Sequence, residues 1–222
     1  MTRLLQYSDV ENVYDDPVRA GRLAGRLREL SGPDALVVGT GDNTAPGVVA
    51  LAARGRQALD LFDAVDTDFE TFGNHDFDFG PVATLDVVGD SAVQWVSANV
   101  YDDEGGRFGR DEGVVPWTVA DVDGERVGLF GVTDPATGSL NPMAADVTFT
   151  DPVEAAREAV DVLSGSDTDH VVALSHLGAG DDALAAIDGV DVVLGGHVHS
   201  RRNELVTGTR CTRPGVNGEA DR

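Results

Sequence analysis

The chain has 222 residues, enough for one large domain or two small ones, and its 41% hydrophobic residues can form a sizeable core. It carries 39 acidic residues against 16 basic ones, for a net charge of −23. Because no basic stripe is available for phosphate contacts, this charge excludes nucleic-acid polymers and anionic membranes as partners. With no run of 18 apolar residues and no signal-type N-terminus, we expect a soluble, cytoplasmic protein.

The basic residues of the chain are all arginine, and lysine is absent. Such a composition fits either an ordinary acidic protein or a protein from a salt-saturated cytoplasm, of haloarchaeal type. In molar salt the Debye length falls to about 3 Å, so that the repulsion within a strongly acidic protein is screened. The complete absence of lysine makes us favour the halophilic interpretation.

The first predicted strand covers residues 3–7. If the backbone stays extended beyond it, Asp9 and Glu11 project to the same face, because side chains alternate along a strand. A helix is then expected from Asp16 as N-cap and Pro17 as its first residue.

The next predicted strand, residues 34–40, is almost wholly apolar, as in a strand buried on both faces, and it ends at Asp42. A helix over residues 48–62 leads to a third strand over 69–72. That strand stops at Gly73-Asn74-His75-Asp76, and the chain continues with a helical piece from Pro81 and a strand over 93–100.

The glycine-rich, charged stretch 101–113 has no periodicity, so we expect a surface loop. Strands over 114–122 and 126–132 flank Asp123-Gly124, a dipeptide typical of tight hairpin turns. Residues 1–222 contain no interdomain linker, which indicates a single domain. The remaining predictions are a helix from Asp151-Pro152, strands over 170–175 and 190–194, and a hairpin of 203–206 with 209–212.

Five apolar runs stop at side chains that can bind metals, and the carboxyl ends of strands can converge in open α/β folds. Carboxylate, imidazole and amide ligands together suit Mn²⁺, Fe²⁺, Co²⁺ or Zn²⁺ rather than the oxygen cages of Ca²⁺. The candidates exceed what one metal needs and fit two metals that share Asp42. They are Asp9, Glu11, Asp42, Asn74, His176, His197 and His199.

Two further residues receive ordinary interpretations. His170 begins its predicted strand and so lies at the opposite edge of the sheet, where a solvated or capping histidine is expected. The single Cys211 lies far from any motif and is expected to be an inert packing residue.

The ordered set resembles the calcineurin-like metallophosphoesterases, most of all the N-terminal catalytic domain of the 5′-nucleotidases and 2′,3′-cyclic phosphodiesterases. The resemblance implies an α/β fold, a four-layer α/β/β/α sandwich of mixed sheets flanked by helices. The matching pieces are Asp9-x-Glu11, Gly41-Asp42, Gly73-Asn74-His75-Asp76-Phe77-Asp78, Ser175-His176-Leu177-Gly178 and Gly196-His197-x-His199.

The resemblance also implies roles for these residues. His75 would be the histidine beside the scissile phosphate, and Asp78 would orient its ring and favour the protonated form. A metal-bridging hydroxide would attack phosphorus in line. One metal would be held by Asp9, Asp42 and His199, and the other by Asp42, Asn74, His176 and His197.

The chain departs from the family pattern at Glu11, where the family has histidine. A carboxylate there adds negative charge and hardness, so we expect Mn²⁺ or Mg²⁺ to be preferred relative to a histidine site, with Mn²⁺ favoured overall. The alternative is that Glu11 points to solvent and one metal is lost.

A second departure follows His199, because the chain ends at Arg222. We therefore expect the C-terminal nucleotide-binding domain of the family to be absent. Without that domain, the sequence gives no support for specificity toward a particular base. The exposed edge could be covered by a homo-oligomer or by a partner domain.

Two functions remain open from the sequence. The first is hydrolysis of a phosphate ester, a nucleotide or similar small phosphomonoester, by a dinuclear enzyme. The alternative is a catalytically impaired fragment that acts as a metal-binding or scaffold module. The pair His75 and Asp78 favours the first, because catalysis needs it and metal binding does not.

The halophilic interpretation predicts that the fold is lost when salt is dialysed away, because the repulsion among 39 acidic side chains is then no longer screened. Circular dichroism in molar KCl and in dilute buffer measures this directly. A spectrum that stays unchanged in dilute buffer would count against the interpretation.

Overall fold

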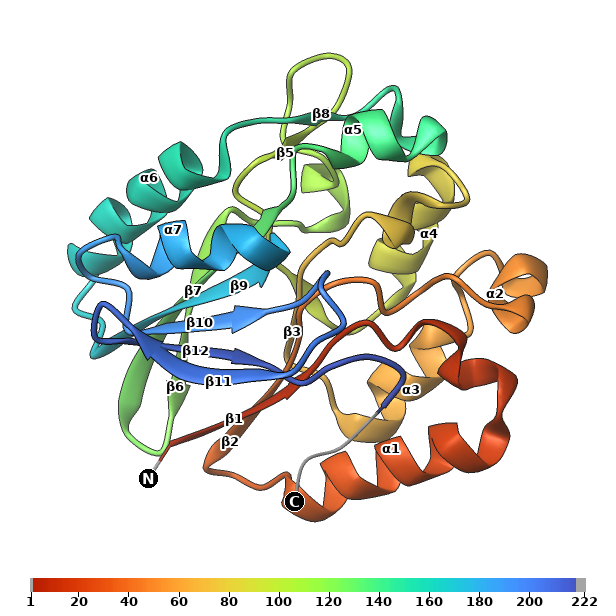
Figure 1. Cartoon of the computed structure of the whole chain (residues 1–222), viewed down its shortest axis with the longest axis horizontal. Helices are drawn as coiled ribbons and strands as arrows, with labels where there is room; N and C mark the ends of the chain where they lie inside the picture. The colour runs from red at the N-terminus through yellow and green to blue at the C-terminus, as the bar shows by residue number, and fades with distance from the viewer. Residues whose placement is uncertain (1, 219–222) are drawn as a thin grey trace.

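Two β-sheets pack face to face, and helices cover the outer face of each (Figure 1). The structure is a computed structural model, and it describes residues 2–218. The smaller sheet has the strand order β1-β2-β3-β4, and all its neighbouring strands are parallel. Its strands are β1 (Arg3–Tyr7), β2 (Ala35–Gly39), β3 (Phe69–Glu70) and β4 (Gln94–Trp95).

The larger sheet has the order β11-β12-β10-β9-β7-β6, with parallel pairing in the middle and an antiparallel pair at each edge. A separate antiparallel pair joins β5 (Val100–Tyr101) to β8 (Thr148–Phe149). The strands of the larger sheet are β6 (Trp117–Val122), β7 (Glu125–Thr133), β9 (His170–His176), β10 (Val192–Gly195), β11 (Arg202–Val206) and β12 (Thr209–Arg213).

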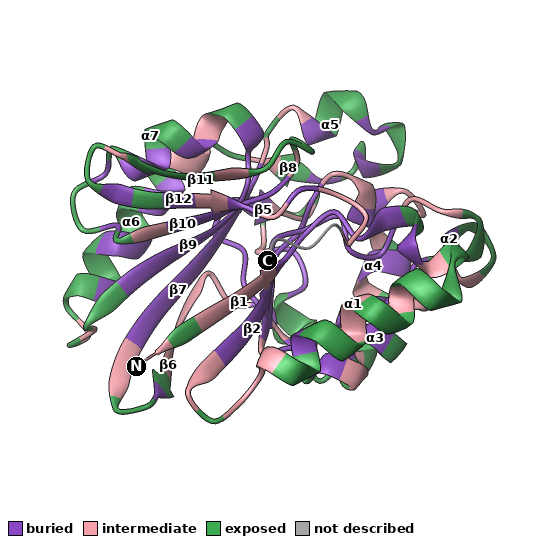
Figure 2. Ribbon diagram, turned by 60° about the horizontal axis from the view of Figure 1, so that its bottom comes forward, coloured by how far each residue is buried: buried purple, intermediate pink, exposed green. Residues whose placement is uncertain are grey.

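Helices α1 to α4 lie on the side of the smaller sheet, and α6 and α7 cover the larger one (Figures 1 and 2). The α-helices are α1 (Pro17–Leu30), α2 (Val48–Ala53), α3 (Ala58–Val65), α4 (Pro81–Asp90), α5 (Thr137–Leu140), α6 (Pro152–Ser164) and α7 (Asp181–Ala185). Short 3₁₀ helices are η1 (Glu11–Asp15), η2 (His75–Phe77), η3 (Arg110–Glu112), η4 (Pro142–Ala144) and η5 (Gly178–Gly180).

The alternation of side chains along the central strands divides the core into layers. In β9, Val172 and Leu174 belong to the core between the two sheets, whereas Val171 and Ala173 pack on the side of α6 and α7. Strand β2 alternates in the same way between the inter-sheet core and the helices that cover it. The predicted four-layer α/β/β/α sandwich is confirmed, although only the larger of the two packed sheets is mixed.

Three predicted elements differ in detail from those observed. The helix expected over residues 48–62 is two helices, because Arg54 (φ +54°) and Gly55 (φ +86°) adopt left-handed conformations that end α2. The strand expected over 93–100 is broken into β4 and β5, which belong to different sheets. The loop expected over 101–113 contains η3.

Among residues 2–218, every helix falls short of the length and apolar character that crossing a membrane requires.

Gly131 in β7 packs closely against the segments that follow β3 and β4, and its carbonyl accepts a 2.7 Å hydrogen bond from Ala98 N. A Cβ atom there would collide with the Val96 carbonyl and with Thr71 Oγ1. We predict that Gly131→Ala lowers the free energy of unfolding by about 1–3 kcal/mol.

The matched control is Gly21→Ala in α1, where a Cβ meets no atom within 4 Å. Because alanine is favoured over glycine inside a helix, the free energy of unfolding of this variant should rise by up to about 1 kcal/mol. Urea titrations in molar salt compare the two. Equal unfolding midpoints for Gly131→Ala and the parent would contradict this account of sheet packing.

Candidate metal centre

The residues predicted to form the site lie together at the carboxyl ends of both sheets. Strands β1, β2 and β3 of the smaller sheet lead to it from one side, and β9 and β10 of the larger sheet from the other (Figure 1). Because the parallel strands of each sheet end at the same edge, loops far apart in the sequence meet there.

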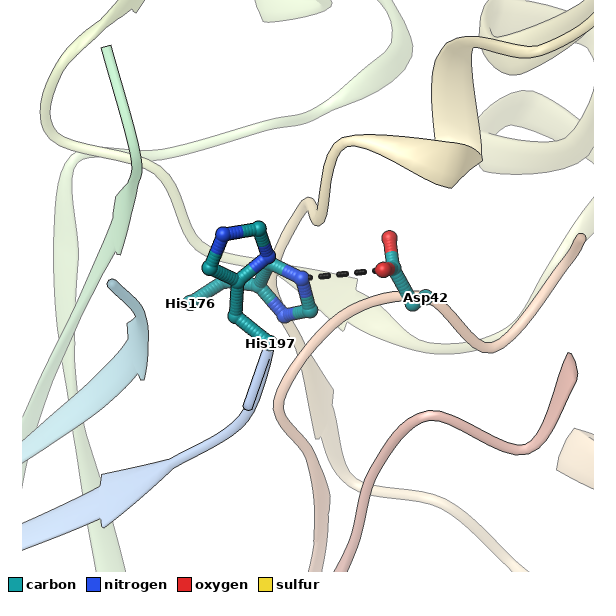
Figure 3. A group of neighbouring side chains, drawn as sticks. All are labelled: Asp42, His176 and His197. Carbon is teal, nitrogen blue, oxygen red and sulfur yellow. Dashed lines mark ion pairs between the residues drawn. The ribbon is translucent and has the colours of Figure 1, made fainter. Parts of the chain in front are cut away.

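The first group of ligand-type side chains consists of Asp42, His176 and His197, whose ligand atoms lie within 4.8 Å of one another (Figure 3). Asp42 follows β2, His176 ends β9 and His197 follows β10, so both sheets contribute. The contact between His176 Nε2 and Asp42 Oδ2 is 3.0 Å, and both side chains are buried. The ring centroids of the two histidines are 5.0 Å apart.

The backbone determines which nitrogen of His176 faces Asp42. Nδ1 lies 2.7 Å from the carbonyl oxygen of Thr40, which can only accept a hydrogen bond, so Nδ1 carries a proton and Nε2 points to the carboxylate. Burial opposes a charged ring, but the Asp42 carboxylate outweighs it and raises the pKa of His176 to about 10. A metal ion bound here would compete with that proton.

Two buried atoms in this region have no hydrogen-bond partner among the described residues: Asn74 Oδ1 and His176 Nε2. His176 Nε2 is nevertheless ion-paired with Asp42 Oδ2, 3.0 Å away. A buried amide oxygen without a partner is costly in a protein interior, and both atoms are suitable metal ligands. The donor set therefore fits a divalent cation.

The second group consists of Asp9, Glu11 and His199. His199 Nε2 lies 2.9 Å from Glu11 Oε1 and 3.8 Å from Asp9 Oδ1. Both acids are buried, so Glu11 does not point to solvent. Burial raises the pKa of each carboxyl, and a cation bound beside them would lower both pKa values again.

The backbone does not stay extended beyond β1, so the condition for placing Asp9 and Glu11 on one face by strand alternation is not met. The strand ends at Tyr7, Asp9 and Glu11 adopt positive φ angles of 49° and 48°, and Glu11 begins η1. Hydrogen bonds from Asp9 N to Gly41 O (3.0 Å) and from Glu11 N to Asp42 O (3.3 Å) hold this turn against the next loop. The two carboxylates approach His199 because of this turn, not because of strand alternation.

Asp9 also contacts the loop that carries the first group. Its Oδ1 and Oδ2 accept hydrogen bonds from His197 N at 3.1 and 3.2 Å. Its Oδ2 accepts a further bond of 2.5 Å from Ser8 Oγ. The two groups are therefore neighbours that share one loop, which spans His197 to His199.

His75 and Asp78 form the pair that the sequence predicted. His75 Nδ1 lies 2.9 Å from Asp78 Oδ2, and this hydrogen bond is the main cause that raises the pKa of His75 to about 9. The ring is partly exposed, and its Nε2 is left to donate to another group. The backbone N–H of His75 donates to Asp42 Oδ1 at 2.7 Å, which places the ring beside the first group.

Two residues of this region were not among those predicted from the sequence. Asn141 Nδ2 donates to Asn74 O (2.8 Å) and to Asp78 Oδ1 (3.0 Å), and nothing local in its sequence indicates this role. Asp134 Oδ2 lies 3.5 Å from His197 Nε2. The position of Asp134 directly after β7 is the same strand-end signal that identified the others.

The two residues given ordinary interpretations lie away from the site. His170 begins β9 at the opposite edge, is half exposed and lies 3.5 Å from Glu125 Oε2. Cys211 is buried in the core beneath α7 and forms no disulfide. The predicted positions of both residues, outside the site, agree with the structure.

Comparison with known proteins agrees with the site. Residues 2–201 match the family described as calcineurin-like phosphoesterase. The 5′-nucleotidase of Diplobatis ommata is 32% identical over 177 residues, which are 78% of this chain and 31% of that protein. Human 5′-nucleotidase is 29% identical over 207 residues, 86% of this chain and 36% of that protein. The chain thus spans about a third of the length of these relatives.

Solved structures show the same fold. The 5′-nucleotidase precursor of Thermus thermophilus superposes with a TM-score of 0.83 at 25% identity and covers 97% of this chain and 49% of its own. The calcineurin-like phosphoesterase YfkN of Bacillus subtilis reaches 0.80 at 20% identity and covers 97% and 81%. Calcineurin-like phosphoesterases use divalent metals, and this structure has two candidate groups to hold them. The chain belongs to the calcineurin-like phosphoesterase family.

Proposed function

We propose that this chain hydrolyses a small phosphomonoester, a nucleotide or a similar compound, with two divalent cations. The observation that supports this most is the pair of neighbouring ligand groups, Asp42-His176-His197 and Asp9-Glu11-His199, with His75 beside them. When bound, two cations supply an acidified water as nucleophile and neutralise charge on the phosphoryl oxygens.

The ligands divide between the two cations as the geometry suggests. Asp9, Glu11 and His199 would hold one, and Asn74, His176 and His197 the other. Asp42 would serve both, since its loop borders each group. The three carboxylates favour Mn²⁺, with Zn²⁺, Fe²⁺, Co²⁺ and Mg²⁺ as alternatives.

His75 would act on the phosphate itself. The hydrogen bond to Asp78, which raises the pKa of His75 to about 9, favours the protonated ring. Asp78 holds Nδ1, so Nε2–H is the donor that can bind a phosphoryl oxygen and stabilise the charge that develops there. Asn141 donates to the other oxygen of Asp78 and keeps this carboxylate in place. As water attacks phosphorus, the ester P–O bond breaks and the alcohol leaves.

The net charge of −23 does not prevent an anionic substrate from binding. Bound cations are the largest local charges in such a site and dominate the field that a phosphate meets. A nucleotide as substrate is supported by relatives named as 5′-nucleotidases. Those proteins are much longer than this chain.

We predict that His75→Ala lowers kcat for p-nitrophenyl phosphate with Mn²⁺ in molar salt by about 100-fold or more, because a charge-stabilising donor is lost. The matched control is His170→Ala, which removes a histidine at the opposite edge of the sheet and should keep parental kcat.

Both variants should retain their bound Mn²⁺. Parental activity in His75→Ala would contradict the role given to this ring. If the parent itself binds Mn²⁺ but shows no hydrolysis above His75→Ala with p-nitrophenyl phosphate, its bis ester or nucleotides, the chain is a metal-binding module instead of an enzyme.

Glu11 should influence which metal is preferred. We expect Glu11→His to lower the affinity for Mn²⁺ relative to Zn²⁺ by about tenfold, because a harder anionic oxygen is replaced by a softer neutral nitrogen. Competition between the two metals, measured by elemental analysis after gel filtration, tests this. An unchanged ratio of bound Mn²⁺ to Zn²⁺ would show that Glu11 is not a ligand.

A further inference from the structure

Glu70 is a fully buried acid in β3 that the proposed chemistry does not use. It lies beneath the loops of the metal centre and is surrounded by hydrogen-bond donors. Its Oε1 accepts from Gly41 N (3.2 Å) and Thr71 N (3.1 Å), and its Oε2 from the Tyr7 hydroxyl (3.2 Å). Asn43 Nδ2 donates to both oxygens, at 3.1 and 3.0 Å.

The surrounding chain is shaped around this carboxylate. Gly39 in β2 lies against it, and a Cβ atom at that position would collide with the carboxylate group. Burial, together with the charge of Asp76, raises the pKa of Glu70 to about 8, so the group is costly to keep in the interior. A side chain that costs this much and only filled space would be better replaced by an apolar one.

Asn43 connects the carboxylate to both ligand groups. It follows Asp42 directly, so its contact with Glu70 holds the loop of the first group. Its Oδ1 accepts a 3.3 Å hydrogen bond from Val10 N, which lies between Asp9 and Glu11 in the second group. One amide side chain thus joins the two loops, and Glu70 fixes the orientation of that amide.

We propose that Glu70 and Asn43 are a positioning pair that sets the distance between the two ligand groups. The proposal rests on the binding of two metals proposed above, but not on hydrolysis. Neither side chain contacts a metal in this scheme; both act through Asp42 on one side and the Asp9–Glu11 turn on the other. Loss of the pair should therefore weaken metal binding while the fold persists.

The chemistry of the pair allows an exchange test. Because Gly41 N, Thr71 N and Asn43 Nδ2 can only donate, Glu70→Gln removes an accepting oxygen and turns an NH₂ group toward the Asn43 amide. Asn43→Asp places two carboxylates face to face. In the double variant, the new amide at position 70 can donate to the new carboxylate at 43, whose other oxygen still accepts from Val10 N. The double exchange restores the pairing that each single change breaks.

Mn²⁺ affinity is measured by isothermal titration calorimetry in molar KCl, with circular dichroism to verify folding. Each single variant should weaken binding by about 10- to 100-fold, the range for residues that support metal ligands. The double variant should return to within about threefold of the parent. The control is Asp68→Ala, which removes a partly buried acceptor of Val37 N (2.8 Å) just before β3 and should leave Mn²⁺ affinity unchanged.

Two kinds of result would overturn the proposal, one from the single variants and one from the double variant. Single variants with parental Mn²⁺ affinity would show that the pair does not position the ligands. A double variant that binds no better than the weaker single one, or that fails to fold, would show that the pairing is not complementary. A further outcome separates this proposal from the proposed function. If the parent binds two Mn²⁺ and the double variant regains the parental affinity, but neither hydrolyses a phosphate ester, the positioning role stands and the enzymatic function fails.

Discussion

The contact between Asp42 and His176 is the interaction on which the rest of the site depends. Asp42 follows β2 of the smaller sheet and His176 ends β9 of the larger sheet. In the interior, Asp42 Oδ2 lies 3.0 Å from His176 Nε2. Two such groups would be costly to bury without partners or a cation. Their meeting requires that the two sheets pack with their carboxyl ends at one edge, so the fold and the metal centre depend on the same geometry.

The convergence of the site could be predicted from the sequence because parallel strands end at one edge. His176 and His197 each come at the end of an apolar run, and this rule predicts that they converge with Asp42, whereas the shared metal was implied by the family resemblance. The rule also separated His170, which begins its strand, from the site. What it could not show is how the chain turns after a strand ends: Asp9 and Glu11 reach His199 through a turn with positive φ angles, not through an extended backbone.

The supporting residues were harder to find because their partners are distant in the sequence. Glu70 lies in the two-residue strand β3 and Asn141 in an irregular segment, and each acts through hydrogen bonds to loops more than 25 residues away. The end of α2 was also not predicted. It depends on the left-handed conformation of Arg54, and the only sign of this in the sequence is the glycine that follows. Patterns of apolar residues predict which elements exist, whereas hydrogen bonds between elements decide their ends.

The central claim is that two cations bind on either side of Asp42. A crystal structure of the chain grown with Mn²⁺ in molar salt, with data collected at the manganese absorption edge, tests it most directly. We expect two anomalous peaks, one among Asp9, Glu11 and His199 and one among Asn74, His176 and His197, with Asp42 touching both. A single peak, or two peaks of which one lies out of reach of Asp42, would contradict the account.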